Sequence, residues 1–222
     1  MDYTAVWLTL KLALVSTIIL MLIGVPLAWW LARGESFLRT LVGTLVSVPL
    51  VLPPSILGFY LLVTMGSDGF IGQMTTSLGL GSFAFTFQGL VIGSVIYSIP
   101  FVVGPIQSTF ESIDQKILQA SYTLGATPLV TFRNIVLPLS WHGLVTSMIL
   151  GFAHTIGEFG VVLMIGGNIP GETQVLSVLI YDHVEALEYQ QAHMMSFILL
   201  VFSFLILLPM YITRKKTKIR YV

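Results

Sequence analysis

Residues 111–139 read ESIDQKILQASYTLGATPLVTFRNIVLPL, a stretch that mixes polar side chains with turn-forming residues. Two apolar runs flank it, Phe87 to Phe110 before it and Ser140 to Ile165 after it. An apolar run of roughly 20 residues is long enough to cross the hydrocarbon core of a bilayer as a helix. We therefore expect these 29 residues, the central loop, to fold on one side of a membrane between two spans.

An apolar stripe predicts a helix in the first half of the central loop. Its members recur at spacings of four, three and four: Ile113, Ile117, Ala120 and Leu124. Ser112 with Gln115 matches a capping box, and Gly125 matches the left-handed position after a helix end. Thr127 and Pro128 match the cap and the first residue of a second helix. The loop is expected to dock on another protein or, alternatively, to lie on the bilayer surface.

Five apolar runs reach the length of a membrane span. They cover residues 7–32, 41–65, 87–110, 140–165 and 194–212. Of the 222 residues, 55% are apolar and only 9% are charged, against roughly 25% charged in soluble domains. The sequence therefore predicts an all-α integral membrane protein with five transmembrane helices, folded as a single domain over residues 1–222.

Lysine and arginine gather in alternate connections between these runs. The first and third connections and the C-terminal tail contain Arg33, Arg39, Lys116, Arg133, Arg214, Lys215, Lys216, Lys218 and Arg220. The second and fourth connections contain none. By the positive-inside rule, the N-terminus lies outside, and the central loop and the C-terminus lie in the cytoplasm. The remaining basic residue, Lys11, is near the outer end of the first run, where its ammonium can reach the interface.

Several functions are excluded by residues that the chain lacks. With no cysteine, it can form neither disulfides nor thiolate metal sites. His183 and His193 lie ten residues apart and lack the spacing of a helical metal-binding pair, so no metal site is expected. No lysine follows a glycine, which excludes a Gly-Lys-Ser/Thr phosphate loop, and an intramembrane enzyme has no motif to support it. No basic patch favours nucleic acid.

One motif in the central loop points to a family. Gln119-Ala120-Ser121 is followed by Gly125-Ala126 and, with nine residues between it and Gly125, by Ile135-Val136-Leu137-Pro138, where the second helix is expected to end. This pattern resembles the EAA motif of permease subunits of ABC importers, although Gln and Ser replace the common Glu and Ala. The resemblance implies that the loop is a coupling helix that docks on a separate ATPase. ATP and Mg²⁺ then belong to that partner, and this chain binds no cofactor.

Three further stretches resemble the molybdate permeases within that family. They read VPLVLPP at 48–54, GEFG at 157–160 and NIPGET at 168–173. The resemblance implies the type I ABC importer permease fold, molybdate import and a bacterial or archaeal plasma membrane. Tungstate permeases share the pattern and remain an alternative; sulfate permeases, which are usually longer, come third.

Transport of a dianion sets further expectations. Moving two charges inward against 100 mV costs about 4.6 kcal/mol, so uptake must be driven, and a passive ion channel is the less favoured alternative. A five-helix chain is too small to enclose a path, which predicts a homodimer with two ATP-binding subunits in membrane lipid. The spans offer only Lys11 and His154 as cations, so selectivity is assigned to an external or periplasmic oxyanion-binding protein.

Five residues within the spans are candidates for the translocation pathway or its gate: Pro53, Pro54, Ser55, His154 and Glu158. A proline pair in mid-span frees backbone carbonyls, which are tolerated in lipid only beside other helices or a wet cavity. Glu158 repels an oxyanion, so we interpret it as an anchor or gate that bonds to nearby backbone or to His154. His154 itself is either a helix-packing residue or part of the pathway.

The fourth connection contains a second candidate segment, Pro170, Gly171, Glu172 and Thr173. Its Pro-Gly sequence is typical of a turn. The segment either dips back toward the pathway or forms an ordinary exterior turn, and the sequence does not separate the two.

Overall fold

The computed structural model describes residues 3–219, with side chains up to residue 212. These residues are helical and form no strand, which confirms the all-α fold class. The α-helices are α1 (Tyr3–Ala32), α2 (Phe37–Ser47), α3 (Pro54–Met65), α4 (Phe70–Ser77), α5 (Phe87–Glu111), α6 (Gln115–Thr123), α7 (Pro128–Thr131), α8 (Leu137–Leu139), α9 (Trp141–Ile156), α10 (Gly160–Gly166), α11 (Leu176–Glu185) and α12 (Tyr189–Ile219). A 3₁₀ turn, η1 (Val48–Leu50), and a π-helical turn, η2 (Phe132–Val136), lie between them.

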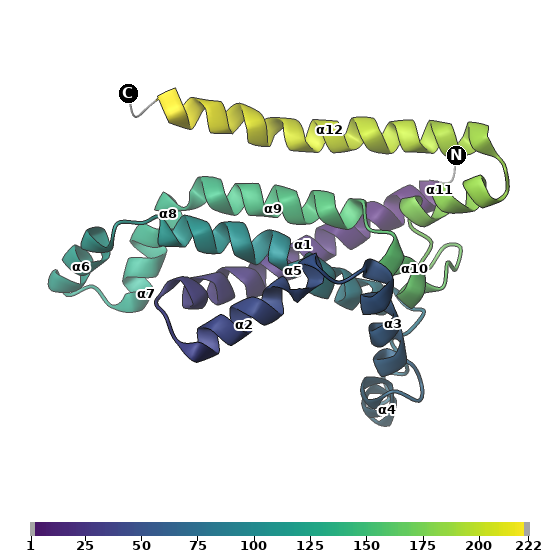
Figure 1. Cartoon of the computed structure of the whole chain (residues 1–222), viewed down its shortest axis with the longest axis horizontal. Helices are drawn as coiled ribbons and strands as arrows, with labels where there is room; N and C mark the ends of the chain where they lie inside the picture. Colours follow the sequence, from purple (N-terminus) through teal and green to yellow (C-terminus); the bar gives the residue numbers. More distant parts are fainter. Residues whose placement is uncertain (1–2, 220–222) are drawn as a thin grey trace.

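Helices α1, α5 and α9 form the packed centre of the molecule (Figure 1). Small residues at every fourth position allow α9 to approach its neighbours closely: Gly143, Ser147, Gly151 and Thr155. A Cβ on Gly151 would lie only 2.6 Å from Cγ2 of Val102 on α5. Because lipid is as apolar as the helices, close contacts of this kind, rather than the hydrophobic effect, drive helix association in a membrane.

The apolar run at 41–65, predicted as one span, is two helices. Helix α2 ends at Ser47, η1 follows, and α3 begins at Pro54 with Pro53 as its N-cap residue. Proline has no N–H, and its ring clashes with the preceding turn, so the proline pair ends one helix and begins another. Beyond this break, α3 and α4 extend away from the central helices as an arm (Figure 1).

The run at 140–165 is also interrupted. Helix α9 ends at Ile156 and α10 begins at Gly160, which leaves residues 157–159 outside any helix. At the other end of α9, the segments Pro128–Leu139 and Trp141–Ile156 meet at 73°. Four helices of the described chain are long and apolar enough to cross a membrane, and five spans result if this bent pair counts as one.

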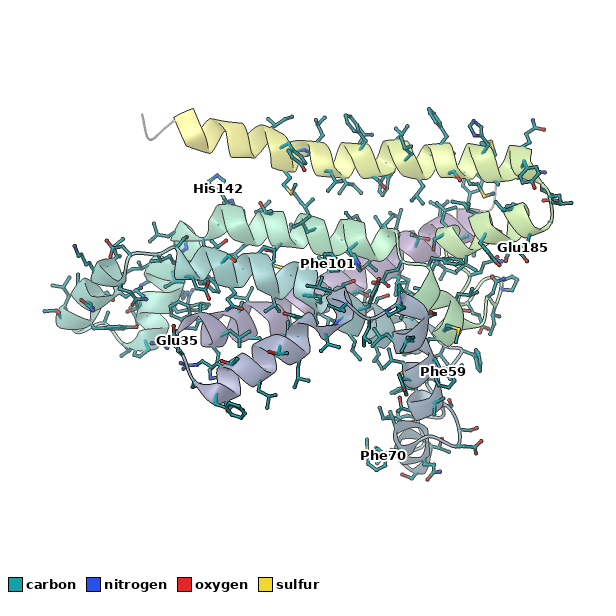
Figure 2. The ribbon with its side chains drawn as sticks, viewed as in Figure 1. Glu35, Phe59, Phe70, Phe101, His142 and Glu185 are labelled. Atoms are coloured by element: carbon teal, nitrogen blue, oxygen red, sulfur yellow. The ribbon has the colours of Figure 1, made fainter. Side chains whose placement is uncertain are left out.

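The two ends of the molecule carry different elements. Helices α6 and α7 and the last turns of α12 lie at one end, and α11 and the start of α1 lie at the other (Figure 1). Glu35 and His142 lie toward the first end and Glu185 at the second (Figure 2). The central loop and the end of α12 thus lie on the same side, as the pattern of basic residues requires. Which side faces the cytoplasm stays a prediction.

We expect Gly143→Ala to destabilise the packed centre. A Cβ at Gly143 would lie 2.6 Å from Thr109 Cγ2, and Thr109 is held in place because its hydroxyl donates to Pro105 O at 2.8 Å. Overpacking of this kind costs about 1–3 kcal/mol, so the thermal unfolding midpoint in detergent should fall. Gly104→Ala is the control, because no described atom lies within 4 Å of a Cβ there. Equal losses in both variants would contradict the packing role.

Candidate functional site

A cavity of about 580 Å³ opens where α3, α5, α9 and α10 meet. Its lining comes from the start of α3, the middle of α5, the end of α9 and the break before α10: Pro54, Ser55, Tyr97, Ala153, His154, Gly157, Glu158, Phe159 and Gly160. The structure thus brings together four of the five residues predicted for the pathway, from two distant parts of the sequence. The fifth, Pro53, precedes them as the N-cap residue of α3.

Close packing of α3 on α10 builds one wall of this cavity. A Cβ on Gly58 would lie 2.7 Å from Met164 Cβ, and one on Gly160 would lie 3.0 Å from Pro54 Cβ. Only glycine fits at these approaches without displacing a neighbour. The N-terminus of α3 is therefore held at the cavity, and such a helix end carries a partial positive charge.

Glu158 lies in the break between α9 and α10 and is only 3% exposed. Its Oε2 accepts a hydrogen bond from Ser94 Oγ at 2.5 Å, and its Oε1 accepts one from Ser98 Oγ at 2.6 Å. A buried carboxylate needs such partners because it has lost its hydration. The sequence pointed to backbone or His154 as partners; the structure instead assigns two serines of α5. Their spacing of four residues within an apolar run was the signal available in the sequence.

His154 forms the side of the cavity next to this carboxylate. Its Nδ1 lies 2.9 Å from Ser98 Oγ and 3.6 Å from Glu158 Oε1. The ring stacks on Phe101 with 3.8 Å between centroids and lies 4.9 Å from the Tyr97 ring. Figure 2 shows Phe101 in the middle of the molecule, away from both ends. These contacts hold the imidazole in one orientation, with 19% of its side chain exposed.

The segment Pro170–Thr173 contributes no residue to the lining of this cavity. Thr173 is buried, and its Oγ1 donates to Gly166 O at 2.6 Å, while the other three residues are exposed. The loop is tied to α11 because Asn168 Nδ2 donates to both carboxylate oxygens of Asp182, at 3.0 and 2.8 Å. In this conformation the segment is a turn held against α11.

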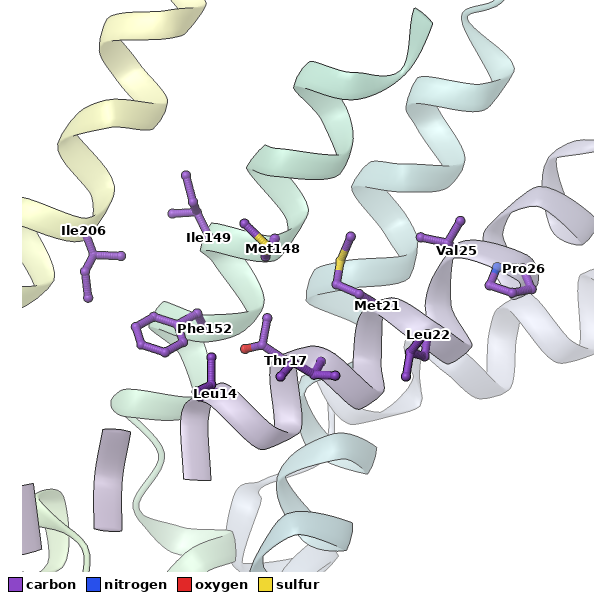
Figure 3. Close-up of a pocket in the computed structure, with 11 residues that line it drawn as sticks. Leu14, Thr17, Met21, Leu22, Val25, Pro26, Met148, Ile149, Phe152 and Ile206 are labelled. Carbon is purple, nitrogen blue, oxygen red and sulfur yellow. The ribbon is translucent and has the colours of Figure 1, made fainter. Parts of the chain in front are cut away.

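A second cavity, of about 630 Å³, lies between α1, α9 and α12 (Figure 3). Its lining is apolar apart from one threonine: Leu14, Thr17, Ile18, Met21, Leu22, Val25, Pro26, Met148, Ile149, Phe152 and Ile206. The hydroxyl of Thr17 donates to Ala13 O within α1 at 2.6 Å. The described lining residues therefore offer no free hydrogen-bond donor to an oxyanion, and the cavity suits lipid hydrocarbon.

In the central loop, α6 begins with a different cap from the one predicted. The N-cap residue is Asp114, whose Oδ1 accepts a hydrogen bond from Lys116 N at 2.9 Å. Ser112 Oγ instead donates to Thr109 O at 2.7 Å. The predicted capping box is therefore wrong. A carboxylate at the cap accepts the free N–H group and also interacts favourably with the positive end of the helix dipole.

The turn after α6 has the predicted geometry. Gly125 has φ +83°, and Thr127 caps α7, whose first residue is Pro128. Ala126 is half-buried. The second helix does not stop at Pro138, however: it widens into the π-helical turn η2 and continues as α8. A wider turn relieves the clash between a proline ring and the turn before it. Pro138 is exposed.

One contact holds the central loop together, and two attach it to the rest of the chain. Within the loop, Ser121 Oγ and Thr131 Oγ1, both buried, lie 2.9 Å apart and join α6 to α7. Arg33, just after α1, donates to Tyr122 Oη at 3.2 Å. An aromatic cluster with centroids 5.3–6.1 Å apart joins α1, α5 and η2: Trp29, Phe110 and Phe132. The sequence pattern predicted none of these contacts because their partners are distant along the chain.

The outward side of the central loop is largely apolar. Ile117 is 43% exposed and Leu124 is 88% exposed, whereas Leu118, outside the predicted stripe, is 7% exposed. Gln119 and Ala120 of the predicted motif are exposed as well. Most of the apolar stripe therefore faces away from the molecule.

A bundle of membrane-length helices around a partly polar cavity, with a folded loop at one end, defines a membrane transport subunit. More specifically, the chain belongs to the family described as "Binding-protein-dependent transport system inner membrane component", which matches residues 24–217. This match confirms the permease family that the sequence resemblance implied.

Two relatives match almost the whole chain. It is 55% identical over 214 residues to the molybdenum transport system permease protein ModB of Azotobacter vinelandii, covering 96% of this chain and 95% of that protein. It is 35% identical over 220 residues to ModB of Haemophilus influenzae, covering 98% and 96%.

Solved structures share the fold at low sequence identity. A bacterial ABC transporter involved in the import of the acidic polysaccharide alginate matches with a TM-score of 0.79 at 18% identity, covering 96% of this chain and 79% of that one. The methionine ABC transporter MetNI, in inward-facing conformations, matches with a TM-score of 0.70 at 21% identity, covering 95% and 94%. These matches confirm the predicted type I ABC importer permease fold.

We expect the two cavities to differ in access to water. The chain has no cysteine, so an introduced cysteine is the one thiol in it that a reagent can label. Ser55→Cys, in the first cavity, should react with a water-soluble, membrane-impermeant thiol reagent at least about tenfold faster than Thr17→Cys, because the reactive thiolate forms where water reaches it. Labelling after denaturation supplies the control for total thiol. Equal rates in the folded protein would contradict the assignment of the first cavity as the hydrated one.

Proposed function

We propose that this chain is the membrane permease subunit of an ATP-driven molybdate importer and has no catalytic activity of its own. The observation that carries the proposal is its 55% identity to the molybdenum permease of Azotobacter vinelandii over 96% of this chain. Molybdate is a tetrahedral dianion, and its entry against the membrane potential has to be coupled to an energy source. Tungstate and sulfate share this shape and charge and are the competing substrates.

The first cavity supports a role as part of the passage. Ser55 supplies a hydroxyl, the N-terminus of α3 supplies a partial positive charge, and His154 supplies an imidazole. Ser94 and Ser98 donate hydrogen bonds to the carboxylate of Glu158, which reduces its repulsion of an incoming anion. We propose that the break at residues 157–159, which lies between α9 and α10 and outside any helix, is the place at which the passage opens and closes.

The central loop supports docking of an ATP-binding subunit. Its exposed apolar side chains, Ile117, Ala120 and Leu124, suit a hydrophobic groove on a partner. A bilayer-surface role is less favoured, because an interfacial helix is usually far more basic than α6, whose basic residue is Lys116. ATP and Mg²⁺ would be held by that partner, with one partner for each copy of this chain.

The arm formed by α3 and α4 supports a homodimer. Phe59, Tyr60 and Phe70 on this arm are 50%, 62% and 80% exposed. In Figure 2 the arm carries Phe59 and Phe70 far from the central helices. The first cavity lies at the base of the arm, so a second copy related by two-fold symmetry could cover the arm and close the passage.

An external binding protein completes the proposed complex. The alginate transporter has been solved in complex with a pentasaccharide-bound periplasmic protein, and it shares this fold. The cavity of this chain offers few groups for tight recognition, so we assign selectivity to such a protein.

The test is substrate-dependent transport by the assembled complex. The chain would be purified with its ATP-binding subunit and binding protein, placed in liposomes, and assayed for molybdate uptake with tungstate and sulfate as competitors. We expect ATP-dependent molybdate uptake, strong competition by tungstate and weak competition by sulfate. Uptake that continues without ATP would favour a passive channel, and preferential sulfate uptake would overturn the assignment of the substrate.

We expect Gly125→Val to uncouple the chain from its ATPase. Gly125 has φ +83°, a conformation that costs a residue with a side chain about 1–2 kcal/mol, so the turn after α6 should rearrange. Molybdate uptake and co-purification of the ATP-binding subunit should both fall at least about fivefold. Gly81→Val is a matched control, because Gly81 has φ +73°, has equally open surroundings and lies in the connection between α4 and α5. Retained co-purification in the Gly125 variant would contradict the docking role.

A further inference from the structure

Ser94 and Ser98 look equivalent in the sequence, but only Ser98 has further side-chain partners, His154 and Thr155. Both are fully buried on α5, and both donate a hydrogen bond to the carboxylate of Glu158. Only Ser98 also contacts His154, with 2.9 Å between its Oγ and the imidazole Nδ1. Ser98 therefore connects the buried carboxylate to the titratable side chain that lines the first cavity.

The direction of these hydrogen bonds follows from the number of hydrogens. A serine hydroxyl has one hydrogen, and an ionised carboxylate can only accept. Ser98 therefore donates its hydrogen to Glu158 Oε1, and its oxygen accepts from its two other neighbours, His154 Nδ1 at 2.9 Å and Thr155 Oγ1 at 3.2 Å. His154 Nδ1 consequently carries a hydrogen and donates it to Ser98. Because the hydrogen of the neutral ring is then on Nδ1, Nε2 is the ring nitrogen without a hydrogen.

The other ring nitrogen of His154, Nε2, has no hydrogen-bond partner among the described residues. In the neutral ring this nitrogen is an acceptor, which an oxyanion repels; in the protonated ring it is a positively charged N–H donor. We infer that His154 contacts the transported tetrahedral oxyanion through its protonated Nε2, and that Ser98 is the positioning residue that holds the ring for this contact. The inference rests on the proposed function and deepens it.

His154 is the side chain of this lining that can carry a positive charge. The titratable groups that face it are Glu158 and Tyr97, and the described residues that line the cavity include neither lysine nor arginine. Glu158 carries the opposite charge 3.6 Å from Nδ1 and so weakens the attraction of a protonated imidazole for an anion. The resulting contact with a dianion is weak, which suits a passage because an anion that binds tightly cannot leave.

The test is the pH dependence of molybdate uptake by the assembled transporter in liposomes, at saturating binding protein. Histidine is the side chain that ordinarily changes charge near neutral pH, so uptake by the unmodified protein should decline as the pH rises. His154→Gln should lower the maximal rate about tenfold at the acidic end, by loss of a charge-assisted hydrogen bond, and should remove the decline. His154→Arg keeps a cation at all these pH values and should restore uptake without the decline.

A pair of serine variants separates positioning from general packing. Ser98→Ala and Ser94→Ala each remove one hydroxyl from Glu158, but only Ser98→Ala also frees the imidazole. Ser98→Ala should therefore lower the maximal rate several-fold more than Ser94→Ala, with the half-saturating concentration of binding protein unchanged. His142→Gln is the control for histidine replacement, because His142 is exposed at the start of α9 and does not line the cavity. It should keep the rate and the pH profile.

The outcomes distinguish this inference from the proposed function. If His154→Gln keeps the rate and pH profile of the unmodified protein, the contact with the anion is wrong, while molybdate uptake by the unmodified protein still supports the proposed function. If Ser94→Ala and Ser98→Ala lower the rate equally, the positioning role of Ser98 is wrong. If the unmodified transporter imports no molybdate, the proposed function itself fails.

Discussion

The arrangement of this molecule depends on the hydrogen bonds that the buried carboxylate of Glu158 accepts. It is buried in the apolar centre, where an ionised group without partners carries a large desolvation penalty. Ser94 and Ser98 supply those partners, so they hold α5 against the break at residues 157–159. Non-helical backbone at membrane depth is tolerated only inside protein or beside a wet cavity. The same carboxylate therefore fixes the break, the neighbouring helix and the wall of the cavity.

Helix α5 also connects this cavity to the central loop. Phe110, near its C-terminal end, belongs to the aromatic cluster with Trp29 and Phe132, and Ser94 and Ser98 lie in its other half. Two prolines inside the helix, at positions 100 and 105, lie between these contacts. Prolines remove hydrogen bonds and permit bending. A single helix thus connects the central loop to the residues around Glu158.

Local signals in the sequence were reliable where the cause of the structure is local. Gly125 takes the left-handed conformation and Thr127 caps the next helix, because backbone geometry within a few residues decides both. Contacts between distant parts of the chain could not be predicted in the same way. Ser94 and Ser98 are four residues apart in an apolar run, but nothing in the sequence showed that both bond to Glu158. The cap of α6 was misassigned because Ser112 and Asp114 are both acceptable caps, and Ser112 is instead the C-cap residue of α5, with its hydroxyl bonded to Thr109 O.

The apolar stripe of the central loop shows that a regular pattern can predict a helix without predicting which way its apolar face points. In a self-contained protein such a stripe packs inward, but α6 buries Leu118 and leaves Leu124 88% exposed. Exposed apolar side chains on a polar loop carry a solvation cost that natural surfaces avoid unless another molecule covers them. The contacts that hold this loop are both polar and apolar: Arg33 bonds to Tyr122, while Leu118 and Phe132 pack against the central helices. The loop therefore keeps its place without Ile117, Ala120 and Leu124, and these three apolar side chains remain exposed.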